Sequence, residues 1–127
     1  MSISQKQISS VVSLKGQQRY EYFVKMVVDR EEAWGLYQDG WALAATENGQ
    51  QVFPLWPAKE YAQLCVNREW MDYVPAPIPL VELMNDLLPK LRADGILPGV
   101  FYTPSDVGVT PTIDQLLEDL NEELENY

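Results

Sequence analysis

The segment from 33 to 56 constrains the fold most strongly, because it alternates apolar residues through two strong turn signals. It contains Asp39-Gly40 and Asn48-Gly49, the dipeptides most typical of two-residue hairpin turns. We therefore predict a three-stranded antiparallel meander over these residues. Pro54 cannot donate a ladder hydrogen bond, so the third strand is expected to be an edge strand or to bulge at that residue.

Two-residue turns would fix the register of both hairpins. Leu36 would then lie opposite Leu43, and Ala45 would lie opposite Val52. This register puts one bulky set on one face of the sheet: Trp34, Leu36, Trp41, Leu43, Val52 and Trp56. The other face carries Gly35, Tyr37, Ala42, Ala44, Phe53 and Leu55. Because both faces are largely apolar, the sheet needs cover on both sides, or on one side plus a partner.

Helical periodicity in the rest of the chain supplies candidates for that cover. Helices are predicted over 4–16, 17–29, 57–66, 80–93 and 112–124. The residues 67–79 are predicted as a loop with a short extended piece at 73–74, followed later by a strand over 97–103 and a short one over 107–110. Pro89 should kink or split its helix. The predicted fold class is α+β, a mostly antiparallel sheet of about four to five strands packed by helices, with a helical N-terminus and a C-terminal helix. We expect a single domain over 1–127, divided into a helical N-terminal segment over 1–30, the meander over 33–56, and helices plus a late strand over 57–127.

The chain contains no histidine and a single cysteine, Cys65. These counts exclude Ser-His-Asp and Cys-His catalysis, His-ligated zinc and an internal disulfide. Cys65 lies within an apolar helical stripe, which favours a buried, inert thiol. No phosphate-binding glycine pattern or calcium-loop spacing is present. We therefore place no catalytic residue and expect no cofactor and no metal site.

The charge is acidic overall and unevenly distributed. The formal net charge is -10, with nineteen acidic and nine basic residues. Residues 1–30 hold five basic and two acidic side chains, whereas 94–127 hold eight acidic and no basic ones. An acidic chain is a poor ligand for nucleic acid, so nucleic-acid binding is not expected. This distribution predicts attraction between the two ends, within one chain or across a homodimer, or binding of a basic protein partner.

The first functional hypothesis is a soluble, acidic, non-enzymatic module that acts through protein–protein contact. Its candidate partner surface combines aromatic residues and carboxylates: Tyr37, Trp70, Asp72, Tyr73, Glu118, Glu122 and Glu125. No targeting signal or membrane-spanning run is visible, so we expect a cytoplasmic location and no membrane association.

The alternative is an enzyme that binds a small molecule or a metal without histidine. Its site would lie between the sheet and the helix over 57–66. It would use carboxylate, lysine and tyrosine chemistry from Lys59, Glu60, Tyr61 and Arg68. A polar cluster converging in a deep pocket, with strongly perturbed carboxylates, would favour this alternative.

Several short strings together resemble an uncharacterised bacterial family, the domain-of-unknown-function family 2750. They are RYEYF at 19–23, DGWAL at 39–43, VFPLWP at 52–57 and GVFYTP at 99–104. The likeness covers nearly the whole chain. It implies a small cytoplasmic bacterial protein and transfers no catalytic residue.

Overall fold

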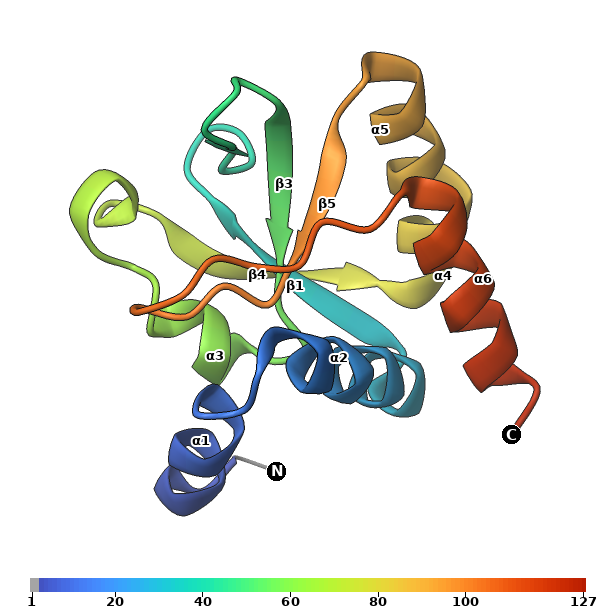
Figure 1. The fold of residues 1–127 in the computed structure, drawn as a ribbon, viewed down its shortest axis with the longest axis horizontal. Helices are drawn as coiled ribbons and strands as arrows, with labels where there is room; N and C mark the ends of the chain where they lie inside the picture. Colours follow the sequence, from blue (N-terminus) through green and yellow to red (C-terminus); the bar gives the residue numbers. More distant parts are fainter. Residues whose placement is uncertain (1–2) are drawn as a thin grey trace.

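The computed structural model describes residues 3–127 and has an α+β fold whose five strands form two small sheets (Figure 1). The first sheet pairs β1 (Glu32–Tyr37) with β4 (Val74–Pro79) in antiparallel fashion. The second has the order β2-β3-β5, formed by β2 (Ala44–Ala45), β3 (Gln51–Leu55) and β5 (Leu97–Val100). The predicted fold class is correct, although the strands are divided between two sheets.

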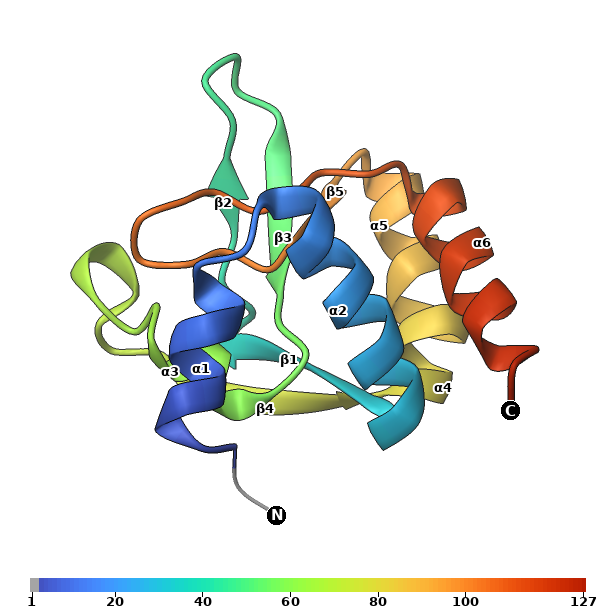
Figure 2. The ribbon, with the colours of Figure 1, turned by 60° about the horizontal axis from the view of Figure 1, so that its bottom comes forward.

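Helices cover the sheets on several sides. They are α1 (Gln5–Val12), α2 (Gly16–Arg30), α3 (Lys59–Gln63), α4 (Leu80–Glu82), α5 (Leu88–Asp94) and α6 (Ile113–Leu124), with a 3-10 turn η1 (Arg68–Trp70) and a π-helical turn η2 (Leu83–Leu87). α6 packs against both α2 and α5, and in Figure 2 α5 is seen between α2 and α6. The side chains of Ser4 and Thr112 cap α1 and α6, as expected for residues that satisfy free N–H groups at helix starts.

The predicted meander is wrong in its first hairpin. β1 pairs along its whole length with β4, and Tyr37 forms only an isolated bridge with Trp41. Beyond that point the chain leaves β1, and Trp56 takes the place beside Trp34 that the prediction gave to Ala45. In this position the Trp56 side chain is fully buried.

The second hairpin exists, but its register is shifted by one residue. Ala44 lies opposite Val52, where the prediction placed Ala45. The turn contains three residues, because Gly49 donates to the Thr46 carbonyl and the Thr46 N–H donates to Gln50. Gly49 has a φ of 85°, the left-handed conformation of a three-residue turn with a G1 bulge.

The stretch predicted as a loop over 67–79 contains the strand β4. Its prolines occupy alternate positions, Pro75, Pro77 and Pro79. Because alternate residues of a strand face the same edge, all three positions that lack an N–H face the edge away from β1. The remaining residues can donate toward β1, and Leu80 continues this pattern by donating to Glu31. Prolines are tolerated in an edge strand when they face away from the ladder, so the spacing of two makes β4 an edge strand.

Pro54 lies in β3, between two different environments. β5 runs parallel to β3 on one side and places Gly99 opposite Pro54. β2 flanks β3 only at Gln51 and Val52, so Pro54 lies beyond its end. The prediction that the third strand is an edge strand therefore applies only to the part of β3 that contains Pro54, beyond the end of β2.

Pro89 does not break the helix over 80–94 but is preceded by the π-helical turn η2. The N–H of Leu88 donates to Leu83, five residues earlier. This wider turn accommodates a proline, which lacks an N–H and collides with the carbonyl four residues before it. The predicted irregularity is confirmed, and Gly95 then ends α5 in the left-handed conformation, with a φ of 71°.

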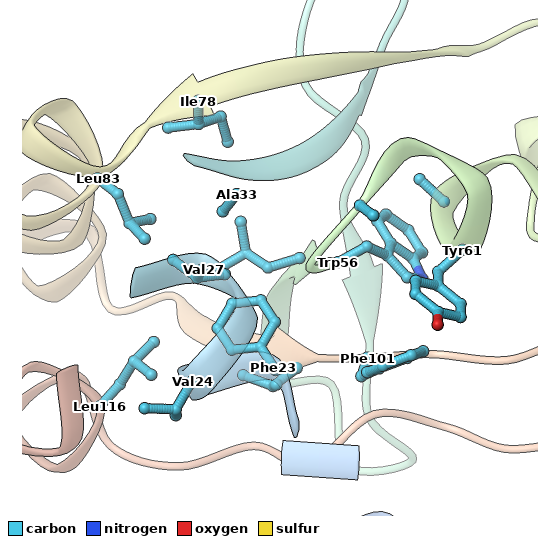
Figure 3. Close-up of a cluster of buried hydrophobic side chains, with 14 of the residues drawn as sticks. Phe23, Val24, Val27, Ala33, Trp56, Tyr61, Ile78, Leu83, Phe101 and Leu116 are labelled. Carbon is cyan, nitrogen blue, oxygen red and sulfur yellow. The ribbon is translucent and has the colours of Figure 1, made fainter. Parts of the chain in front are cut away.

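The core lies where α2 meets both sheets and α6 (Figure 3). Phe23 and Val27 of α2 are fully buried, as are Trp56 and Phe101. Tyr61 packs on Phe101, with ring centroids 4.9 Å apart. Leu116 extends this core into α6.

The phase of the prolines in β4 gives the first prediction. Ala76→Pro removes an N–H that the register directs at Gly35, and should lower the free energy of unfolding by about 3 kcal/mol. Pro77→Ala restores an N–H on the outer edge and should cost only about 0.4–1 kcal/mol, through the unfolded chain. Urea unfolding followed by tryptophan fluorescence measures both. Equal losses in the two variants would contradict the assigned edge.

Candidate functional site

A large cleft lies between β2, the turn η1 and the segment that follows β5. It has a volume of about 710 Å³ and is open to solvent. A second cleft of about 590 Å³ shares Ala45, Tyr102 and Val107 with it and extends toward the tip of the β2–β3 hairpin. We call the two joined clefts the β2 groove. Its walls are residues 44–48, 67–70 and 102–108.

The aromatic part of the groove is formed by Trp70 and Tyr102. Their rings meet edge to face, with centroids 6.0 Å apart. Two buried groups hold the backbone of Tyr102 in place: Trp56 donates its indole N–H to the Tyr102 carbonyl at 2.9 Å, and the Cys65 thiol lies 3.5 Å from the same oxygen. The groove wall is therefore anchored directly in the core.

Cys65 lines this cleft without being reactive. It is buried, and desolvation raises the pKa of its thiol to about 11. A thiol with so high a pKa contains very little thiolate at neutral pH, and the chain has no histidine to remove its proton. The structure agrees with the sequence-based expectation of an inert cysteine.

An ion pair between buried Arg19 and exposed Asp106 fixes the wall opposite β2. Arg19 of α2 is buried, and its guanidinium donates to the Leu14 carbonyl and, at 2.8 Å, to the Asp106 carboxylate. The hydrogen bond from Arg19 lowers the pKa of Asp106. Thr103 and Asp106 exchange backbone hydrogen bonds and close a tight turn between them. Arg19 Nε and Thr103 Oγ1 are buried without any hydrogen-bond partner within residues 3–127.

Two residues next to the groove have strained backbones. Phe101 has a φ of 68° although its side chain is fully buried, and Arg68 has a φ of 49°. This conformation is unfavourable for bulky side chains and is found mostly where the surrounding structure imposes it, often at functional sites. Phe101 also explains why β5 ends at Val100, although a strand was predicted to Thr103.

The charged groups of the groove are mainly carboxylates. Glu47 and Glu69 are exposed, and neither forms an ion pair within the described residues of the chain. Asp106 is neutralised by Arg19, which leaves Arg68 as the one cationic residue lining the groove walls among residues 3–127. The rim is therefore mildly acidic and partly apolar.

The structure divides the predicted partner surface into two groups. Tyr37, Trp70, Asp72 and Tyr73 come from β1 and from the segment leading into β4, where Tyr37 lies opposite Val74. Of these four, only Trp70 lines the β2 groove. Glu118 and Glu122 lie on the exposed part of α6, and Glu125 is its C-terminal cap. α6 lies at the other side of the molecule (Figure 1).

The residues proposed for an enzyme do not converge on one cavity. Tyr61 is buried, and its hydroxyl lies 3.0 Å from the hydroxyl of Tyr22. Burial raises the pKa of Tyr61, so it is a poor proton donor and a poor base precursor. Glu60 accepts a bond from Ile3 at 3.4 Å, Lys59 is exposed, and only Arg68 lines the groove.

Two further findings bear on chemistry and location. Within residues 3–127 no group of three or more acidic or cysteine side chains is placed to hold a metal ion. No helix of that same stretch is both long and apolar enough to cross a bilayer.

These observations define a small α+β protein with a groove beside a short strand, where residues 3–127 bring no set of acid–base groups together. The chain belongs to the family described as protein of unknown function (DUF2750), whose profile matches residues 20–120. This match confirms the resemblance of the sequence motifs. Searches of curated proteins and of solved structures found no significant match.

The Arg19–Asp106 pair generates a prediction about pH. Because Arg19 lowers the pKa of Asp106 in the folded chain, the ionised carboxylate adds to stability at neutral pH. This contribution is lost as the pH falls through the lowered pKa. Asp106→Asn should therefore lower Tm by a few degrees at neutral pH, and the difference from the wild type should shrink in acid.

Thermal unfolding followed by circular dichroism at several pH values measures this difference. Asp72→Asn is the matched control, since Asp72 is exposed and forms no ion pair within residues 3–127. A difference that stays constant with pH would show that the Asp106 charge does not hold the groove wall.

Proposed function

We propose that this chain is a non-enzymatic interaction module that binds an extended, basic segment of a partner protein in the β2 groove. The observation that carries this proposal is an open groove with an aromatic wall and two carboxylates, Glu47 and Glu69, that lack ion-pair partners within the described residues. Lys or Arg side chains of a bound segment would supply the missing counter-charges.

The shape of the groove favours a polypeptide over a small metabolite. Small-molecule sites are usually enclosed and bury most of the ligand surface. The β2 groove is open along its length and runs from η1, past Ala45, toward Asn48 at the hairpin tip. An extended chain fills such a shape and gains contacts with Trp70 and Tyr102, residue types that are favoured at binding hot spots.

Electrostatics on the scale of the whole molecule supports the same partner. The net charge of -10 attracts a basic chain from a distance and raises its association rate at low salt. The positive N-terminal segment is joined to the acidic C-terminal segment within one chain by the Arg19–Asp106 pair. This ion pair is one intramolecular contact between the two oppositely charged ends.

The proposal predicts selective binding of a basic peptide. A synthetic peptide of alternating Lys and Val should bind and alter tryptophan fluorescence through Trp70, whereas a peptide of alternating Glu and Val should not. Glu47→Gln combined with Glu69→Gln should weaken binding about tenfold, and added salt should weaken it further.

Fluorescence titration measures these affinities. Glu122→Gln combined with Glu125→Gln is the matched control, because it removes the same charge from α6 and its C-terminal cap, outside the groove. Equal binding of both peptides, or of neither, would overturn the proposed function.

A further inference from the structure

We propose that the partner segment binds by adding a strand to the outer edge of β2, so that the sheet order becomes partner-β2-β3-β5. This inference rests on the proposed function and specifies how the same groove is used. β2 is the end strand of its sheet and is followed by the hairpin tip that projects from the body (Figure 2). Its free side forms part of the groove wall.

The register determines which backbone groups are free. The backbone N–H of Thr46 donates to the carbonyl of Gln50. Along an antiparallel ladder, hydrogen-bonded residue pairs alternate with non-hydrogen-bonded pairs. The pair of Ala44 with Val52, two residues along, is therefore also hydrogen-bonded. Ala45 and Leu43 must then direct their N–H and C=O groups away from β3. Neither residue exchanges a backbone hydrogen bond outside the strand ladder within residues 3–127.

These free groups are accessible. Ala45 is exposed and lines both clefts, and Leu43 is 42% exposed. The side chains of Ala44 and Ala45 are small and present little bulk to an incoming strand, which would lie at the ordinary spacing between neighbouring strands, about 4.8 Å.

The other strand edges are already used or lack donors. β4 ends the first sheet, but its outer edge carries Pro75, Pro77 and Pro79 and offers no N–H at these positions. The outer edge of β5 is occupied at Val100, which exchanges two backbone hydrogen bonds with Val109. The edge of β1 away from β4 pairs with Trp56 and Ala42. β2 is therefore the strand in residues 3–127 that retains both free donors and free acceptors.

Charge indicates which kind of segment fits. Glu47 lies beyond one end of the β2 edge, and Glu69 lies at the opposite end of the groove. A segment pairing with Leu43 and Ala45 would place its flanking residues near these carboxylates. We therefore assign as occupant an extended stretch of another protein in which Lys or Arg side chains alternate with apolar ones.

Backbone pairing is tested with the Lys/Val peptide and two variants at one position. Ala45→Pro removes the outward N–H without touching the bonds to β3, and should weaken peptide binding about tenfold. Ala45→Val keeps that N–H and should bind as the wild type does. Retained affinity in Ala45→Pro, measured with a folded variant, would overturn strand addition.

Amide hydrogen exchange of the wild type gives an independent test that does not depend on how the variants fold. Peptide at saturation should slow exchange of the Ala45 and Leu43 amides about tenfold or more. Glu118, on α6, is the internal control and should not change. Peptide that binds without protecting Ala45 would overturn strand addition while leaving the proposed function intact. Absence of any binding to the wild type would instead overturn both.

Discussion

The structure depends on one backbone junction, the pair of hydrogen bonds that Trp34 and Trp56 exchange at 2.8 Å each. This pair joins the end of β3 to β1 and therefore connects the two sheets. The Trp56 side chain lies in the core and donates to the carbonyl of Tyr102, where the groove wall begins. Trp34 and Trp56, which are separated by two turns in the sequence, thus link the arrangement of the two sheets to the core and to the groove wall. A buried indole without this acceptor would leave an unsatisfied donor, which is costly in a core.

The elements that local signals specify could be predicted from the sequence, whereas strand partners could not. The apolar stripes located the longer helices nearly correctly. The pairing of β1 with β4 escaped prediction because it joins residues about forty positions apart, and three prolines argued for a loop. Their spacing of two was the available signal, since it leaves one edge of a strand intact. The hairpin register failed because Asn48-Gly49 also fits a three-residue turn, and a shift of one residue moves side chains to the other face.

The candidate site was harder to predict than the fold. Trp70 was identified from its residue type, and it does line the β2 groove. The rest of the groove depends on backbone conformation, notably at Arg68 and Phe101, where no glycine or asparagine signals a positive φ. The ion pair of Arg19 joins it to Asp106, 87 residues away, and only the folded chain brings the two together. Charge alone directed attention to α6, whereas the groove lies at the opposite side of the molecule.

The prolines of β4 also determine how many neighbours one molecule can accept. Growth of a fibre by edge-to-edge pairing requires every molecule to offer two open strand edges, one for the preceding copy and one for the next. Here β4 is blocked, β5 is occupied, and β2 alone remains open within residues 3–127. The described part of the protein therefore offers one open strand edge for pairing with another molecule. Any complex formed through β2 is closed after a single addition, and accidental pairing between two copies ends at the dimer.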